Sequence, residues 1–393
     1  MTELCTRVRA LSEKTAAATV TDRRHLHAHP ELSFEEHATV QYVRERLDEL
    51  SIPYREVAGT GLVAEIRGRS GPTVALRADL DALPIEEKNG VPYRSQAPGV
   101  MHACGHDVHT AALIGAARIL VPLKDRLSGT VRLLFQPGEE KLPGGATLML
   151  RDGALENPVP QAIFGQHVHP PLPAGTVGFR PGIYMASTDE LFLTVRGRGG
   201  HGAMPHQAVD PITITAQLIT ALQQLVSRET DPTLPVVLTF GRIESEGGAT
   251  NIIPNAVHLQ GTLRTLDEAW RKELHRRLRR TAEGIAAALG GTAELEVRHG
   301  YPFLKNDEAL TRWAQSEACT LLGDDRVVDL PIRMTGEDFA FYSHQLPACF
   351  YRLGVGGPGH AGSPVHTDTF DVDEGCLRTG ASLLAWFALR QLS

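Results

Sequence analysis

The chain has 393 residues, more than the roughly 100–200 of an ordinary domain, and this length predicts two domains with substantial cores. Apolar residues make up 42% and charged residues 22%, a balance that excludes a disordered or fibrous chain. The net charge of −7, without a long basic run, excludes nucleic acid and anionic membranes as expected partners and favours a small-molecule ligand.

No apolar run reaches the roughly 18–20 residues that would span a bilayer. The N-terminal stretch MTELCTRVRA lacks the apolar core of a secretory signal. The five cysteines are odd in number and scattered, which argues against a disulfide framework and fits a reducing compartment. We therefore expect a cytoplasmic protein that does not associate with membranes.

The first elements along the chain alternate between helix and strand patterns. Ser33 and Glu36 form a capping-box signal, and apolar residues at helical spacing follow from Val40 to Leu50. Strands are expected near Leu62–Ile66, Thr73–Ala78, Thr130–Gln136 and Ala162–Val168, with helices near Val108–Val121 and Ala146–Asp152. This alternation predicts an α/β layer whose sheet is mostly parallel.

From about Ser187 to Arg298 the pattern changes to strand, helix, strand, strand, helix, strand. The predicted elements are Leu191–Val195, Ile212–Arg228, Val236–Ile243, Asn255–Leu263, Asp267–Leu289 and Ala293–Val297. This order is typical of the ferredoxin-like α+β arrangement. After Gly300 the α/β style returns, with helices near Glu308–Leu322 and Gly375–Leu389 and a strand near Ala348–Leu353.

The predicted fold class is α/β, with a discontinuous α/β domain and an inserted ferredoxin-like domain. We place the outer domain at residues 1–186 and 299–393, and the inserted domain at residues 187–298. Two G-x-G-x-x-G stretches, beginning at Gly197 and Gly354, do not open a predicted helix, so we expect no dinucleotide cofactor.

The segment MHACGHDVHT places Cys104 and His106 two residues apart, just before a predicted helix. A thiolate and an imidazole at this spacing can bind one metal ion. The alternative is structural, with Cys104 a small buried residue and Asp107 a helix N-cap.

Two adjacent carboxylates, Glu139 and Glu140, follow the strand Thr130–Gln136, at the strand end where open α/β sheets carry their active sites. Adjacent side chains in an extended loop point in different directions, so one carboxylate can bind metal while the other faces an attacking water. A solvated acidic pair is the alternative.

Further candidates lie at other connections of the α/β domain. His167 and His169 alternate on a predicted strand that turns just after them, so one of the two is expected to face inward, and His366 lies in a distant loop. With Cys104, His106 and the glutamates, they supply enough donors for two divalent ions. Asp79 and Asp81 are candidates to orient a ligand imidazole, with turn formation as the alternative.

These stretches resemble the amidohydrolase branch of the peptidase M20 family, which includes aminoacylases, hippurate hydrolases and N-acyl-amino-acid amidohydrolases. The matching stretches are RADLDALPIEE, GVMHACGHDVHT, LLFQPGEE, FGQHV, GRGGHGAMPHQAVDP, TNIIPNAVHLQGTLRT and TGEDFAFY. They run from about His25 to the C-terminus, and the ACGHD and QPGEE pair is the specific part. The resemblance implies a dinuclear catalytic domain and an inserted lid through which two copies form a homodimer.

The resemblance also implies a role for individual residues. Glu139 would be the general base, and His201 would reach across the dimer to stabilise the oxyanion. Asn251 and Arg264 would hold the polar end of the substrate, although Arg264 can also form an ordinary surface ion pair. The two ions would be zinc or manganese, with cobalt or nickel as alternatives. The implied metal ligands are Cys104, His106, Glu140, His167 and His366, with Cys104 bridging.

The implied reaction is hydrolysis of the amide bond of N-acyl amino acids, in which the metals activate a water and Glu139 relays its proton to the leaving amine. A dipeptidase or aminopeptidase acting on a free α-amino group is one alternative, and a non-catalytic ligand-binding protein on the same scaffold is another. Gly138 stands where the family commonly has alanine. Glu337 and Asp338, in TGEDFAFY, are expected to cap a helix and are left outside the predicted site.

Overall fold

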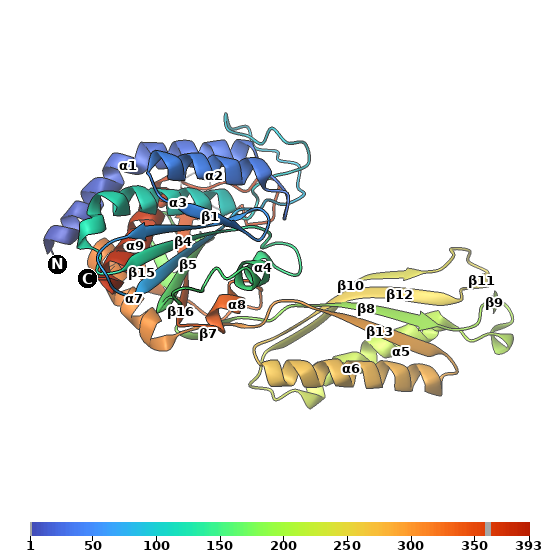
Figure 1. Cartoon of the computed structure of the whole chain (residues 1–393). Coiled ribbons are helices and arrows are strands. Elements are labelled where there is room, and N and C mark those ends of the chain that lie inside the picture. The colour runs from blue at the N-terminus through green and yellow to red at the C-terminus, as the bar shows by residue number, and fades with distance from the viewer. Residues whose placement is uncertain (1, 358–362) are drawn as a thin grey trace. The chain divides into compact units, whose positions relative to one another are not determined.

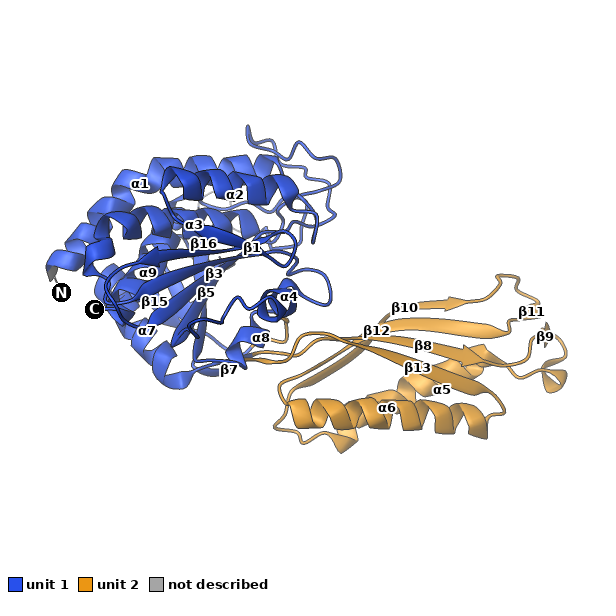
Figure 2. Cartoon of the chain, viewed as in Figure 1, with its two compact units in different colours: residues 1–184, 305–332, 338–393 blue, residues 185–304, 333–337 orange. Residues whose placement is uncertain are grey.

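The computed structural model describes residues 2–357 and 363–393, which divide into two compact units (Figure 2). Unit 1 comprises Met1–Tyr184, Lys305–Ile332 and Asp338–Ser393, and unit 2 comprises Met185–Leu304 and Arg333–Glu337. The segment 333–337, which the sequence analysis assigns to the outer domain, belongs to unit 2. The reason is local pairing, because Ala186 donates its N–H to the carbonyl of Thr335 and Met185 bridges Arg333.

Unit 1 is built on an eight-stranded sheet of order β1-β2-β4-β3-β5-β16-β6-β15 (Figure 1). The central strands β4, β3, β5 and β16 are parallel to one another, whereas β1 and β2 join one edge in antiparallel fashion. The strands are β1 Tyr54–Val57, β2 Gly61–Arg67, β3 Thr73–Asp79, β4 Thr130–Gln136, β5 Ala162–Pro173, β6 Val177–Phe179, β15 Val327–Asp329 and β16 Ala348–Gly356. The mixed, mostly parallel α/β sheet expected from the sequence is confirmed.

The central strands form because apolar residues predominate in their sequences, and charged residues within them, such as Arg77 and Arg352, are buried with hydrogen-bond partners. Every residue of β3 and of β16 is buried, which is typical of parallel strands covered on both faces. Their carboxyl ends meet at one edge of the sheet, where polar residues follow. A further short ribbon pairs β7 Gly182–Met185 with β14 Leu304–Asn306.

The helices of unit 1 lie in layers over this sheet. Helices α3 and α9 contact each other and strand β3, and the long helix α1 packs on both of them (Figure 1). None of the helices described is long and apolar enough to cross a membrane. The helices are α1 Thr2–Ala28, α2 His37–Glu49, α3 His106–Leu120, α4 Gly145–Arg151, α7 Glu308–Leu322, α8 Ala340–Ser343 and α9 Gly375–Gln391, with 3-10 turns at Val121–Arg126 and Asp324–Arg326.

The capping box predicted from Ser33 and Glu36 is wrong. Glu36 precedes helix α2 but its side chain makes no cap hydrogen bond. Its carboxylate instead accepts the N–H groups of Phe34 at 2.9 Å and Gly138 at 2.8 Å, and the hydroxyl of Thr60. The carboxylate is drawn away from the helix because these buried donors surround it.

Unit 2 has a four-stranded antiparallel sheet of order β10-β12-β8-β13, with two helices packed on it (Figure 1). Its chain order is β-α-β-β-α-β, the ferredoxin-like connection. Helix α5 begins at Pro211 after the N-cap Asp210, whose carboxylate accepts the N–H of Ile212. The elements are β8 Asp189–Arg196, β9 Gly200–His201, α5 Pro211–Gln224, β10 Val236–Ser245, β11 Ile252–Ile253, β12 Ala256–Thr265, α6 Glu268–Ala288 and β13 Thr292–His299, with short helical turns at Pro205–Gln207 and Leu225–Glu229.

Candidate metal centre

The segment just before helix α3 brings two of the predicted ligands into unit 1. Cys104 is 6% exposed and His106 is fully buried. Gly105 between them has φ 80°, and a Cβ there would lie 2.6 Å from the side chain of Val168. Glycine is therefore required for both the left-handed backbone and the close approach to β5.

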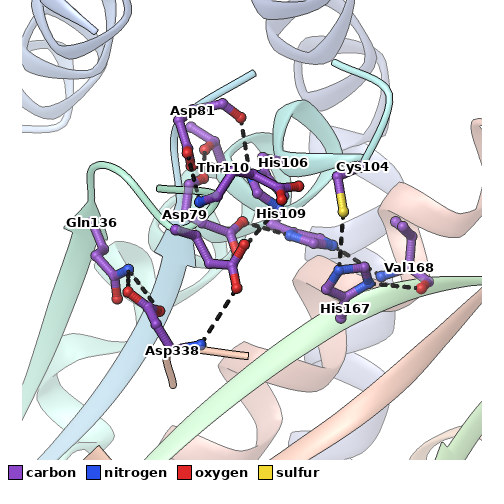
Figure 3. Close-up of polar contacts among 12 residues, drawn as sticks. Asp79, Asp81, Cys104, His106, His109, Thr110, Gln136, His167, Val168 and Asp338 are labelled. Atoms are coloured by element: carbon purple, nitrogen blue, oxygen red, sulfur yellow. Dashed lines mark hydrogen bonds and ion pairs between the residues drawn. The ribbon is translucent and has the colours of Figure 1, made fainter. Parts of the chain in front are cut away.

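The predicted ligands of unit 1 converge around the Cys104 sulfur. Its Sγ lies 3.4 Å from His167 Nε2 and 3.3 Å from His366 Nε2, and His366 Nε2 lies 3.2 Å from Glu140 Oε1. Figure 3 shows the sulfur pointing at the His167 ring. Two ligand groups share Cys104, one with His106 and His167 and the other with Glu140 and His366, and the donor atoms within each group lie within 4.8 Å of one another.

His366 reaches this cluster from a loop late in the chain. Its backbone φ is 66°, in the left-handed region, and its N–H donates to the carbonyl of Ala103 at 2.8 Å. This hydrogen bond ties the loop to the residue before Cys104. Its side chain is 52% exposed, unlike the other imidazoles of the cluster.

The buried imidazoles are oriented so that their Nε2 atoms face the cluster. His106 Nδ1 lies 2.9 Å from the carbonyl and 3.2 Å from the carboxylate of Asp81, and His167 Nδ1 lies 2.8 Å from the carbonyl of Val168. Proton donation from Nδ1 leaves Nε2 as the lone-pair donor in each ring. His106 Nε2 is buried and has no hydrogen-bond partner among the residues described, which is the state expected of a ligand atom.

His109 has a structural role. Its Nε2 accepts the N–H of Val168 at 2.9 Å, and its Nδ1 donates to Asp79 at 2.6 Å (Figure 3). Both nitrogens are thus used, and burial lowers the pKa of the ring despite the nearby carboxylate. Asp79 therefore orients His109 directly, and its carboxylate lies 3.8 Å from His106 Nε2.

The electrostatics of the cluster fit a cationic centre. Burial, followed by the charge of Glu140, raises the pKa of the Cys104 thiol well above its ordinary value. A thiolate at this depth therefore requires a compensating cation. Sulfur, imidazole and carboxylate donors together suit borderline-soft divalent metals. The residues of the two groups fit two such ions, with Cys104 common to both.

The loop after β4 carries both glutamates, and its backbone N–H groups donate hydrogen bonds to two buried carboxylates. Gly138 donates its N–H to Glu36, and Glu140 donates its N–H to Asp81 at 2.9 Å. Asp81 also accepts the hydroxyl of Ser33 at 2.6 Å. Glu139 is 7% exposed and the side chain of Glu140 is 15% exposed, so neither is a freely solvated surface acid.

Two acids that the sequence suggested as helix caps have other partners. Helix α3 has Gly105 at its N-cap position, and Asp107 pairs with Arg23 at 2.8 Å and with His27 at 2.8 Å. Arg23 also binds Asp371 at 2.8 Å, and its side chain is fully buried. Asp338 does not cap either, because Phe339 occupies the N-cap position of α8.

Unit 2 carries the three remaining predicted residues. His201 pairs with Ile252 in the β9–β11 ribbon, and the carbonyl of Asn251 accepts the N–H of Gly202 at 2.7 Å. His201 Nδ1 accepts the N–H of Ala203 at 3.0 Å, so a neutral ring carries its proton on Nε2. Arg264 lies toward the other end of β12, where burial lowers the pKa of its guanidinium.

Comparisons with known proteins find similar sequences along most of this chain. The model described as Peptidase family M20/M25/M40 matches residues 75–390. An N-acetyl-L-cysteine deacetylase of Bacillus subtilis is 44% identical over 355 residues, which cover 90% of this chain and 83% of that protein. An N-acyl-L-amino acid amidohydrolase of Geobacillus stearothermophilus is 43% identical over 308 residues, covering 77% of this chain and 81% of that protein.

A solved structure is also similar along nearly the whole chain. It is a dinuclear metal-binding peptidase from the M20 family, from Bacillus subtilis. It superposes with a TM-score of 0.83 at 37% identity and covers 97% of this chain and 99% of that chain.

Proposed function

The chain belongs to the peptidase family M20/M25/M40, and on that premise we propose that it is a metal-dependent amidohydrolase that cleaves N-acyl amino acids. The observation that carries the proposal is the pair of ligand groups that share Cys104, with the buried carboxylate of Glu139 beside them. A donor set with a separate base is what metal-assisted amide hydrolysis needs.

We assign the ligands to two divalent ions. Cys104, His106 and His167 would hold one ion, and Cys104, Glu140 and His366 would hold the other. When bound, such ions polarise the amide carbonyl and lower the pKa of water. Mixed sulfur, nitrogen and oxygen donors favour zinc or manganese, and cobalt or nickel also suit them.

Glu139 moves the proton. Its carboxylate accepts a proton from the attacking water and later delivers it to the nitrogen of the leaving amino acid. The new C–O bond forms first and gives a tetrahedral oxyanion, and the C–N bond then breaks as the amine nitrogen is protonated, which yields a carboxylic acid and a free amino acid. His106 and Glu139 belong to one group of donor atoms within 4.8 Å of one another, so the base lies beside the ligands.

Residues of unit 2 are assigned to the substrate and the oxyanion. The Nε2–H of His201 is the donor for the oxyanion, because its Nδ1 already accepts the N–H of Ala203. Arg264 is half-buried, and burial lowers its pKa with no offsetting carboxylate among the residues described. A guanidinium in that state suits the free carboxylate of an N-acyl amino acid, and we assign Asn251 to the same end of the substrate.

We further propose a homodimer formed through unit 2. Large apolar side chains are exposed there, at 47% for Met204, 59% for Ile243 and 62% for Ile252. Exposed apolar groups of this size favour association. We place the protein in the cytoplasm, because its five cysteines are free thiols.

The test is a hydrolysis screen with the protein reconstituted in turn with zinc, manganese, cobalt and nickel. The panel contains acetyl- and benzoyl-capped amino acids and the matching free dipeptides, and we expect cleavage of the capped compounds. Glu139→Gln should lower kcat about 10²–10⁴-fold while each subunit still binds two metals, measured by elemental analysis. Near-wild-type hydrolysis by this metal-loaded variant would refute the role of Glu139, and cleavage of free dipeptides alone would refute the substrate class.

A further inference from the structure

The general base assigned above is held by a residue far away in sequence. The backbone N–H of Asp338 donates to Glu139 Oε1 at 3.3 Å, and the two residues are 199 positions apart. Both are buried, with Asp338 fully so. Glu139 sits in the connection after β4, while Asp338 comes from the TGEDFAFY stretch just before α8.

The side chain of Asp338 accepts hydrogen bonds from three separate elements. Its Oδ1 accepts Arg77 Nη2 from β3 at 2.7 Å and Gln136 Nε2 from the end of β4 at 2.9 Å. Its Oδ2 accepts the same Gln136 amide at 2.8 Å and the N–H of Ala146 in α4 at 2.9 Å. Figure 3 shows the amide of Gln136 directed at the Asp338 carboxylate.

These hydrogen bonds hold the short segment from Gln136 to Glu139 at both of its ends. Gln136 and Glu139 are three residues apart in the chain, and both are bonded to Asp338, the first through its carboxylate and the second through its N–H. The Gln136 side chain is itself fixed, because its Oε1 accepts hydrogen bonds from Arg77 Nε at 2.9 Å and from the Tyr342 hydroxyl at 3.1 Å. The direction of the 338 N–H therefore depends on the Asp338 carboxylate.

We propose that Asp338 is a positioning residue for the base: its carboxylate anchors the backbone so that the 338 N–H orients the Glu139 carboxylate toward the ligand cluster. The inference rests on the proposed function for its catalytic consequence, but not for its geometry. Helix capping does not account for the buried charge, because α8 has Phe339 at its N-cap position. A buried carboxylate satisfied by charged and neutral donors from three elements instead fixes the position of its own backbone.

Asp338→Asn is the direct test. Both carboxylate oxygens accept hydrogen bonds, so either orientation of the amide places its NH₂ group against an N–H donor. We expect kcat to fall about 10–100-fold, because small misplacement of a catalytic group has effects of this order. KM and the two metals per subunit should stay unchanged. The crystal structure of the variant should show the Glu139 carboxylate displaced while Cys104, His106 and His167 stay in place.

Two further variants separate positioning from stability. Asp22→Asn removes another buried carboxylate of unit 1, one that binds Tyr42 at 2.9 Å and Arg118, away from the base. It should lower the unfolding midpoint as Asp338→Asn does, yet keep wild-type kcat. Gln136→Met removes the amide that bonds the Asp338 carboxylate and also the acceptor of Arg77 Nε and the Tyr342 hydroxyl, but it keeps the contacts that Asp338 makes with Arg77 Nη2 and the Ala146 N–H. It should lower kcat less than Asp338→Asn does, and it serves as the test if Asp338→Asn does not fold.

The outcomes are distinct. Glu139 unmoved in the crystal structure, with kcat equal to that of Asp22→Asn, would overturn the positioning role while leaving the proposed function intact. Failure of the wild-type protein to cleave any capped amino acid would overturn the proposed function. In that case the position of Glu139 in the Asp338→Asn crystal structure still decides whether Asp338 holds it.

Discussion

Gly138 shows how closely the loop after β4, which carries the proposed base Glu139, is packed. Its φ is 59°, and a Cβ at this position would lie 2.2 Å from the ring of Phe34. Phe34 also has a left-handed backbone, with φ 69°, and its N–H is bonded to Glu36. Gly138, the residue directly before Glu139, is therefore in close contact with an aromatic residue whose own backbone is strained. It stands at the position where the M20 family commonly has alanine.

We predict that Gly138→Ala destabilises the protein and slows catalysis. The left-handed backbone costs about 1–2 kcal/mol for a residue with a Cβ, and overpacking against Phe34 adds about 1–3 kcal/mol. Urea unfolding measures the loss in free energy, and kcat should also fall because Glu139 is the next residue. In a double-mutant cycle with Phe34→Ala, removal of the ring should relieve part of the cost. A cycle without coupling would show that the ring is not what constrains Gly138.

At the residue scale, the candidate donors could be predicted because ligand chemistry is visible in short motifs. Cys104, His106 and the two glutamates stand out by residue type and spacing. Two of the acids that hold this region, Glu36 and Asp338, could not be predicted, because they act through burial and through backbone N–H groups far away in sequence. Local patterns made both look like helix caps, the commonest role of an acid before a helix.

At the scale of elements, a buried cluster of charged side chains joins strand β8 to helix α6 in unit 2. We call this cluster the ionic link. Asp189 accepts Arg271 Nη2 at 2.6 Å and Nε at 2.9 Å, and His275 Nε2 lies 2.6 Å from the same carboxylate. Burial opposes the charged form of Asp189, but these hydrogen bonds outweigh it and hold the pKa of the carboxyl below its usual value. The link therefore joins the sheet to a helix only while Asp189 is ionised.

We predict that this link makes stability fall in acid. The pKa of Asp189 is lower in the folded than in the unfolded state, so its contribution is complete above the unfolded pKa of about 4 and is lost as pH falls toward the folded value. Urea unfolding between pH 7 and pH 3 should show a flatter decline for Asp189→Asn than for wild type. The variant should also lose up to about 3–5 kcal/mol at pH 7, because Arg271 loses its buried partner.

A matched control is available on the neighbouring strand. Glu294 is exposed on β13, so Glu294→Gln removes one negative charge from unit 2 without breaking a buried contact. It should retain the wild-type dependence on pH. If Asp189→Asn and Glu294→Gln had the same profile, the buried link would not be the source of the acid sensitivity.

The long helix α1 is one of the elements that sequence patterns missed, and the longest of them. The central strands and helices were predictable because apolar residues predominate among their buried positions, as in β3 and β16. In α1 the buried face is largely polar, so the helical spacing carries no hydrophobic signal. Its partners include Arg118 for Asp22, and Asp107 and Asp371 for Arg23. The buried positions are Cys5, Val8, Ser12, Thr19, Asp22, Arg23, Leu26, His27 and Ala28.

At the scale of the whole molecule, the proposed machinery is divided between the two units. Every proposed metal ligand and Glu139 belong to unit 1, whereas His201, Asn251 and Arg264 belong to unit 2. The proposed metal ligands and the base thus all lie in one unit, and the residue proposed as the oxyanion donor belongs to the other. If the protein is a dimer, the two contributions need not come from the same chain, and this question is open to direct measurement.

We predict that His201 acts on the site of the other subunit. Glu139→Gln and His201→Ala dimers are each expected to be inactive. After subunit exchange, about half of the dimers are mixed, and each mixed dimer has one site with both an intact base and an intact partner histidine. Activity should therefore recover to about a quarter of the wild-type value. Mixing Glu139→Gln with a variant of the neighbouring exposed histidine, His206→Ala, is the control, because His206→Ala should be active alone. If exchange is demonstrated by mass spectrometry and no activity returns, His201 serves its own subunit or none.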